Sequence, residues 1–296
     1  MIAFLSIFER LFRSIRAYIV NYLLRRATRY GKQRLGGGVF RLTSGLVIKK
    51  GPPNLLLIEA EAIEFVASQT SIPLSRVRYY YAEGEVGNLV LNYVEGQTFQ
   101  RAWRNLSDAQ RLSVMRRLAG FVDQLRAIPQ PLPPAGSSLP PQGWIGSPLG
   151  RAFADFYATQ DAGVFGPFAN EREFYDWRAL QFKPFGDRHA PTAARIAEIR
   201  HSMPDDHPIV FTHGDINRRN VLVRIHGDGP DDVEVTALLD WEQAGWRPIY
   251  WESRKWMFMG SSTPGWGEFG RDEIGSGYKT EIELDRELQA ISGHIP

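Results

Sequence analysis

The sequence predicts an α+β fold with two lobes, a small β-rich N-terminal lobe and a larger, mainly helical C-terminal lobe. The chain has 296 residues, which is enough for one large lobe or two modest lobes, each with its own apolar core. Short β-rich runs bounded by Gly, Ser and Pro surround one helical segment and end near residue 93. From Thr98 onward the apolar residues follow helical spacing.

The bulk composition is that of an ordinary soluble globular protein, with 43% hydrophobic and 23% charged residues. Lys and Arg number 35 against 33 Asp and Glu, so the balance gives no reason to expect a nucleic-acid partner. The chain has no cysteine, which excludes disulfides, thiolate nucleophiles and Cys-based zinc sites. A reducing compartment is permitted, and we expect a cytoplasmic protein.

Residues 1–30 form the first predicted element, an amphipathic helix with a basic face. Apolar residues recur three and four apart, and six arginines accompany them. Arg10, Arg13 and Arg16 interrupt any apolar run near the roughly 20 residues that a membrane span needs. No small-residue cleavage site of a secretory signal follows. We expect this helix to dock on the small lobe or on a second subunit in a homodimer; contact with a membrane surface is the less favoured alternative.

Residues 31–93 form the predicted small lobe. A glycine-rich turn opens it, and a hairpin, a helix and two further strands follow. The corresponding ranges are 31–38 for the turn, 39–42 and 46–50 for the hairpin, 54–68 for the helix, and 76–81 and 85–93 for the last two strands.

Residues 94–296 form the predicted large lobe. Ser107 is a suitable N-cap for a helix that reaches Leu125. A Pro- and Gly-rich loop over 129–147 and helices near 171–180 and 191–202 come next. Five tryptophans lie between positions 241 and 266, a density that mainly indicates core packing, although one or two could line a substrate pocket.

The segment Phe211–Val223 is the most informative part of the chain. Asp215 and Asn220 lie five positions apart between apolar runs, and a second apolar run ends at Asp240 twenty residues later. Phosphoryl transfer from ATP needs one carboxylate to orient the acceptor hydroxyl, and a carboxylate with an amide to hold Mg²⁺ on the phosphates. Asp215 is therefore the candidate catalytic base, and Asn220 and Asp240 are the candidate metal ligands.

This pattern resembles the catalytic loop and metal-binding aspartate of the aminoglycoside phosphotransferase and choline kinase branch of the protein-kinase-like superfamily. That branch has His-Gly-Asp at the head of the loop, as this chain has at 213–215. The resemblance covers about residues 35 to 290 and implies a two-lobed protein-kinase-like fold. Segments near Trp144, Phe165 and Trp177 and after Asp240 are similar to phosphotransferase-domain proteins common in filamentous fungi.

The resemblance also implies a nucleotide site in the small lobe. Lys49 matches the lysine that grips the phosphates, and Glu59 matches its glutamate partner better than Glu61 does. Main-chain groups near Asn92 and Val94 would meet the adenine at the hinge between the lobes.

Two features depart from the family pattern. The glycine-rich segment lacks a Gly-x-Gly-x-x-Gly, and Arg218 stands where the fungal subgroup commonly has proline, so it could alter the loop or add a phosphate contact. Neither departure removes a group that the chemistry requires. We expect His213 to orient the loop by hydrogen bonding and Glu242 to be a structural or supporting residue.

The implied function is ATP-dependent transfer of the γ-phosphate to a hydroxyl of a small molecule, with a secondary metabolite as one candidate acceptor; ATP and GTP are not distinguished. A non-catalytic nucleotide-binding scaffold and a kinase-like fold reused for other natural-product chemistry are the alternatives. The intact set Lys49, Asp215, Asn220 and Asp240 argues against the scaffold.

The acceptor pocket is expected beside Asp215. An acidic basin for cationic aminoglycosides could come from five carboxylates, namely Glu252, Asp272, Glu273, Glu281 and Glu283. The abundance of tryptophan and proline favours instead a flatter, partly apolar acceptor. The expected walls are segment 144–180 and the tryptophans Trp246, Trp251 and Trp256.

Overall fold

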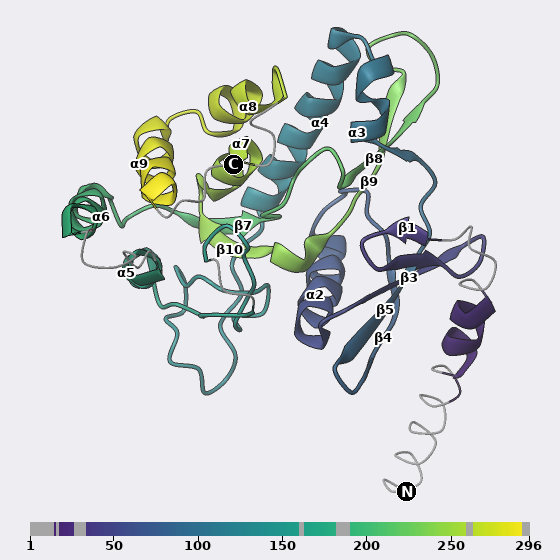
Figure 1. The fold of residues 1–296 in the computed structure, drawn as a ribbon, viewed down its shortest axis with the longest axis horizontal. Helices are drawn as coiled ribbons and strands as arrows, with labels where there is room; N and C mark the ends of the chain where they lie inside the picture. The colour runs from purple at the N-terminus through teal and green to yellow at the C-terminus, as the bar shows by residue number, and fades with distance from the viewer. Residues whose placement is uncertain are drawn as a thin grey trace, which may run out of the picture.

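The structure is a computed structural model of the chain, and it describes residue 15 and residues 18–26, 34–159, 163–181, 190–258 and 263–291. Two lobes are visible in Figure 1, a sheet with one long helix at its side and a larger region built mainly from helices. The predicted α+β class and two-lobed architecture are confirmed.

The small lobe is built on one antiparallel sheet of five strands in the order β1-β2-β3-β5-β4. The later strands and the helix that follows β3 agree closely with the predicted ranges, whereas β1 is a strand within the range predicted as a glycine-rich turn. Their bounds are β1 Arg34–Gly36, β2 Val39–Arg41, β3 Leu46–Gly51, α2 Pro53–Gln69, β4 Val77–Glu83 and β5 Val86–Asn92.

Alternation along β3 gives the sheet two different faces, because successive side chains of a strand point to opposite sides. Val47 and Lys49 point to the inner face, where Val47 joins the core together with Leu56 of α2. Ile48 points to the outer face and forms a separate apolar cluster with Val90, its partner on β5. The inner face therefore carries Lys49 toward α2 and the large lobe.

The outer face of the sheet is covered by the N-terminal helix. Residues 18–26 are helical, and Val20 joins the cluster of Ile48 and Val90. Asn21 donates a side-chain hydrogen bond to Glu83 at 3.2 Å, which ties the helix to the end of β4. This part of the helix docks on the small lobe, as expected; the other residues of the predicted helix, apart from Ile15, lie outside the described residues.

Helix α4 (Asp108–Arg126) lies at the centre of the large lobe. The Ser107 hydroxyl accepts the Gln110 N–H while the Gln110 side chain accepts the Ser107 N–H, so the predicted N-cap is a full capping box. Val114, Leu118 and Val122 recur on one buried face of this helix. Among the helices that the structure describes, none combines the length and apolar character needed to cross a membrane.

The remaining elements of the large lobe include two short sheets, β6-β8-β9 and β7-β10. The structure contains both helices predicted after residue 170. The bounds are β6 Gln97–Thr98, α3 Phe99–Ala102, η1 Trp103–Asn105, α5 Glu171–Gln181, α6 Ala190–Ser202, β7 Ile209–Thr212, β8 Val221–Ile225, β9 Val233–Leu238, η3 Trp241–Gln243, β10 Gly245–Pro248, α7 Trp251–Phe258, α8 Trp266–Phe269, η4 Gly270–Ile274 and α9 Lys279–Ile291.

The five tryptophans between positions 241 and 266 belong to the core. Each is at most 1% exposed, and the rings of Trp256 and Trp266 stack with centroids 4.3 Å apart. The core-packing interpretation is confirmed. The expectation that Trp246, Trp251 and Trp256 line the acceptor cleft is wrong, because packing against their neighbours leaves these side chains no open surface.

Candidate active site

The loop between β7 and β8 holds the predicted His213-Gly-Asp215 motif, and Glu252 of α7 anchors it. The Oε2 atom of Glu252 accepts the main-chain N–H groups of His213 at 2.7 Å and Gly214 at 3.0 Å. Gly214 has φ +74, and a Cβ there would stand 2.8 Å from the carbonyl oxygen of Gln243, so only glycine fits. Glu252, a candidate for the acidic basin, is instead 1% exposed beneath the loop, and that expectation is wrong.

His213 links this loop to the segment that carries Asp240. Its Nδ1 accepts the main-chain N–H of Asp215 at 3.1 Å, and its Nε2 lies 3.1 Å from the carbonyl oxygen of Leu239. This pair of partners suits a neutral ring that donates through Nε2. Burial lowers the pKa of His213 to about 4, which keeps the ring neutral at physiological pH.

Two asparagines hold the carboxylate of Asp215. Asn220 Nδ2 donates to Oδ2 at 2.8 Å, and Asn217 Nδ2 donates to Oδ1 at 3.0 Å. Burial raises the pKa of Asp215 to about 7; the buried Lys255 ammonium opposes this rise and Asp240 adds to it. The sequence interpretation did not include Asn217, although it stands two positions after Asp215, where an Asn readily bonds backward to the chain.

Lys49 meets three carboxylates from two segments on the inner side of β3. Its Nζ lies 2.8 Å from Oε2 of Glu59 on α2 and 3.0 Å from Oε2 of Glu242, and it also pairs with Asp240. Burial disfavours the ammonium form of Lys49, but the three carboxylates outweigh that effect and raise its pKa. Burial raises the pKa of Glu59, and Lys49 opposes this rise.

Asp240 has an unusual backbone conformation. It has φ 69 and ψ 64, and it is the one non-glycine residue with positive φ in the described ranges. Such a conformation costs free energy and persists where the surroundings impose it, most often at functional sites. Here the Leu239 N–H donates to the Asn220 carbonyl oxygen at 2.7 Å, so the metal-ligand candidates Asn220 and Asp240 lie on chain segments joined by a hydrogen bond.

The two hinge candidates differ in their main-chain hydrogen bonds. The Asn92 N–H donates to the Arg76 carbonyl at 3.0 Å, and the Asn92 carbonyl accepts the Ser75 hydroxyl. Both main-chain groups of Asn92 are thus engaged within the small lobe. In the part of the chain that the structure describes, neither main-chain group of Val94 forms a hydrogen bond. Val94 is therefore the candidate with groups left for a purine edge.

Arg218, which departs from the subgroup pattern, faces η1 and the segment after α7. Its guanidinium lies 4.9 Å from the centroid of the Trp103 ring, and it donates to the Thr263 hydroxyl. Its carbonyl oxygen accepts the Gln100 N–H at 2.8 Å. The residue therefore ties the catalytic loop to the start of the large lobe.

Residues 144–159 contact β10 and η3. Gly146 forms a β-bridge with Trp246, and the Phe156 N–H donates to Oε1 of Gln243 at 3.0 Å. The same Gln243 oxygen accepts the buried Lys255 ammonium at 2.9 Å. Phe156 itself is 50% exposed.

Comparisons with known proteins identify the family and the fold. The model of the phosphotransferase enzyme family matches residues 38–278, and no curated protein matches the chain. An APH(2″)-IIIa structure with GDP and kanamycin is 11% identical over 87% of this chain and 81% of that one, with a TM-score of 0.57.

Two other solved structures are similar. An aminoglycoside-3′-phosphotransferase of type VIII is 20% identical over 93% of this chain and 99% of that one, with a TM-score of 0.53. An APH(2″)-IIa complex with gentamicin is 13% identical over 90% and 85%, with a TM-score of 0.54. At these identities the likeness concerns the fold. Since the family model spans most of the chain, the chain belongs to the phosphotransferase enzyme family and is a small-molecule kinase.

Proposed function

We propose that this kinase moves the γ-phosphoryl group of ATP, bound with Mg²⁺, to a hydroxyl of a flat and mostly uncharged small molecule. One observation carries the proposal. On the inner side of β3, the Lys49 ammonium contacts the carboxylates of Glu59, Asp240 and Glu242. In the catalytic loop, Asn220 holds the carboxylate of Asp215 by a hydrogen bond. ATP is plentiful in the cytoplasm and the absence of cysteine suits a reducing compartment, so we place the enzyme there.

The donor set fits a hard divalent cation. The carboxylate oxygens of Glu59, Asp240 and Glu242 lie within 4.8 Å of one another, and a single ammonium, that of Lys49, stands against their three negative charges. The excess of negative charge and the oxygen ligands suit Mg²⁺. Asn220 and Asp240 would hold the ion, which when bound would neutralise negative charge on the phosphates.

Lys49 and Val94 would fix the nucleotide. The Lys49 ammonium, oriented by Glu59, is a point charge for the phosphate oxygens. Val94 offers its main-chain groups to the base. Together they place the γ-phosphorus toward Asp215, and this positioning supplies much of the rate acceleration.

Asp215 would act on the acceptor. Asn217 and Asn220 fix its two carboxylate oxygens, and one of these oxygens accepts a hydrogen bond from the acceptor hydroxyl. As the new oxygen–phosphorus bond forms and the bond to the ADP oxygen breaks, the hydroxyl proton passes to Asp215. A pKa of about 7 leaves a large share of Asp215 ionised at neutral pH.

The preference for an uncharged acceptor rests on the groups next to Asp215. Lys255 contributes positive charge there, and the half-exposed Phe156 bonds through its main chain to Gln243, which Lys255 also contacts. Aminoglycosides carry several positive charges and need carboxylates to bind them. Two acidic candidates are paired with cations instead, Asp272 with Arg271 at 2.8 Å and Glu283 with Arg286 at 3.7 Å. A third, Glu281, lies 3.5 Å from Nε2 of His207.

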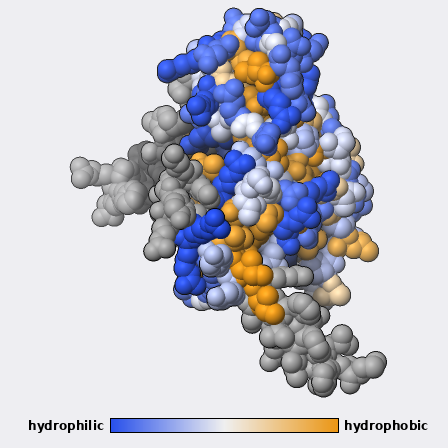
Figure 2. Space-filling model, turned by 90° about the vertical axis from the view of Figure 1, so that its right-hand side faces the viewer, coloured by the Kyte–Doolittle hydropathy of each residue, from blue (hydrophilic) through white to orange (hydrophobic). Residues whose placement is uncertain are grey.

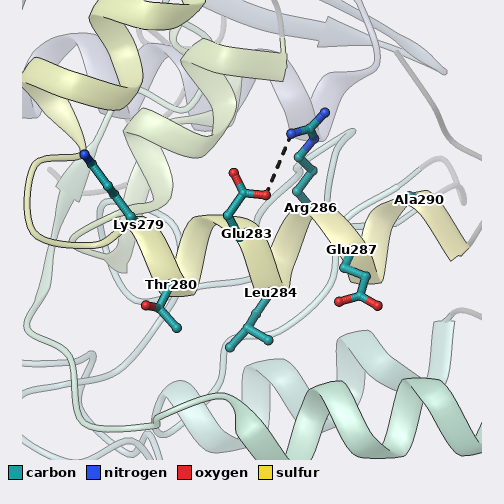
Figure 3. A pocket seen from close by; sticks show the side chains of 7 residues that line it. All are labelled: Lys279, Thr280, Glu283, Leu284, Arg286, Glu287 and Ala290. Atoms are coloured by element: carbon teal, nitrogen blue, oxygen red, sulfur yellow. Dashed lines mark ion pairs between the residues drawn. The ribbon is translucent and has the colours of Figure 1, made fainter.

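A hollow along α9 is no acidic basin either. Figure 3 shows its lining, in which the carboxylates Glu283 and Glu287 alternate with the cations Lys279 and Arg286. All its lining residues come from this one helix. A polycation would find as many repelling as attracting charges there.

The test is an acceptor panel scored for ATP-dependent gain of one phosphoryl mass. We expect uncharged polycyclic alcohols to be modified and kanamycin-like compounds to be poor acceptors. Phe156→Ala should raise the acceptor KM about tenfold and leave the KM for ATP unchanged. Leu132→Ala, at a site 78% exposed elsewhere in the large lobe, is the matched control. Efficient phosphorylation of kanamycin-like compounds would overturn the acceptor class and leave the kinase assignment in place.

A further inference from the structure

We propose that the outer face of the N-terminal helix binds the anionic surface of a lipid membrane. This face is separate from the catalytic cleft, and the phosphotransferase reaction does not use it. The proposal rests on three observations: an apolar stripe that nothing in the described residues covers, a strong charge asymmetry along the chain, and the position of the stripe relative to Lys49.

The stripe is formed by Ile15, Tyr18, Ile19 and Tyr22, which are 45%, 69%, 49% and 56% exposed. At 3.6 residues per turn their positions fall within about 100° of the helix circumference. Val20 points the opposite way and is 9% exposed against the sheet. The helix is therefore apolar on two sides, and docking on the small lobe buries only one of them.

Basic charge is concentrated around the stripe. The first 34 residues contain eight Lys or Arg and one Glu, a net charge of +7, so the remaining 262 residues carry −5 of the chain's total of +2. Arg26 is exposed on the side of the helix that bears the stripe. An apolar stripe that includes tyrosines, bordered by arginines, suits the interface of a bilayer with anionic headgroups.

The same charges argue against a second copy of this chain as the occupant. Two such helices packed stripe to stripe would bring together two segments of +7 each. The negative remainder of the chain is repelled by anionic lipid, so this edge of the molecule is the one that can approach a bilayer.

Membrane binding by this face would leave the catalytic site accessible. The helix covers the face of the sheet that carries Ile48, and Lys49 points from the opposite face. Figure 2 shows this side of the molecule, with hydrophobic residues gathered beside hydrophilic ones. A membrane on this side would leave the cleft facing water.

The experiment is sedimentation of the full-length protein with phosphatidylcholine vesicles, with and without about 30% phosphatidylserine. We expect binding to the anionic vesicles only. The double variant Ile19→Asp with Tyr22→Asp should weaken binding at least tenfold, and Arg26→Glu should weaken it about tenfold. Leu132→Asp, which adds the same charge at an exposed apolar site of the large lobe, should not change it.

Thermal unfolding of neighbouring variants separates this role from docking. Ile19→Asp alters an exposed side chain and should leave the unfolding midpoint unchanged, whereas Val20→Asp should lower it by several degrees. The proposal is overturned if the wild type does not bind anionic vesicles, or if the stripe variants bind as well as the wild type. A concentration-dependent dimer that the double variant abolishes would also overturn it in favour of a second copy.

Discussion

Glu252 Oε2 lies 2.7 Å from the main-chain nitrogen of His213, so a residue of α7 fixes the position of the catalytic loop. Glu252→Ala would leave two buried N–H groups without an acceptor, at a cost of roughly 2–4 kcal/mol in the free energy of unfolding. Glu252→Gln keeps an acceptor oxygen and should recover most of that loss. Urea unfolding of the three proteins measures the difference. An alanine variant as stable as the wild type would show that the loop does not depend on this carboxylate.

Asp215→Asn should lower kcat by roughly two to four decades, because an amide cannot take the acceptor proton. Asn217 and Asn220 surround the site in both proteins, so ATP affinity measured by calorimetry should stay nearly unchanged. Near-wild-type turnover in this variant would rule out Asp215 as the base.

Asp240→Ala should abolish Mg²⁺-dependent nucleotide binding, since it removes the carboxylate that faces both Lys49 and the other acidic groups. Calorimetry with Mg²⁺ and with EDTA gives the comparison. Asp272→Ala, an exposed carboxylate paired with Arg271, should bind nucleotide as the wild type does. Nucleotide affinity of the wild type that EDTA leaves intact would contradict the assignment of Asp240 as a ligand.

The buried neutral His213 predicts a loss of stability in acid. Its pKa is lowered to about 4 in the folded protein and is about 6.5 when unfolded, so the unfolded chain binds the extra proton between these values. The contribution of His213 is fully present above about pH 6.5 and falls by roughly 2 kcal/mol at pH 5.

Other groups titrate in the same range, so the comparison must use a variant. The raised pKa of Asp215 acts in the opposite sense and stabilises the folded protein as pH falls through 7. The loss of unfolding free energy between pH 7 and pH 5 should be about 2 kcal/mol smaller for His213→Gln than for the wild type. His226→Gln alters a half-exposed histidine and should behave as the wild type. A wild-type slope in the His213 variant would contradict a buried neutral ring.

The sequence predicts the elements of this fold well where local signals are strong. The capping box at Ser107 and Gln110 marks the start of α4, and a short β-rich run bounded by glycines marks β3. The site residues that lie in one motif, Asp215 and Asn220, are also found close together in space.

Local signals fail where contacts join distant segments. Glu252 contacts His213 of the catalytic loop, 39 positions away in the sequence, and Lys255 contacts Asp155, 100 positions away. No spacing rule predicts either contact. The same gap explains the error over the tryptophans. A Trp beside a catalytic motif can line a pocket or fill a core, and the packing of α7 and β10 decides between the two.

The tryptophan distribution has a spectroscopic consequence. All eight tryptophans lie between positions 103 and 266. Tryptophan fluorescence therefore reports on the large lobe and responds little to unfolding of the five-stranded sheet. Circular dichroism reports on both regions. Denaturation curves recorded with the two signals will coincide if the lobes melt together and will separate if the nucleotide-binding half melts first. The tryptophans are thus an intrinsic probe for the unfolding of the large lobe alone.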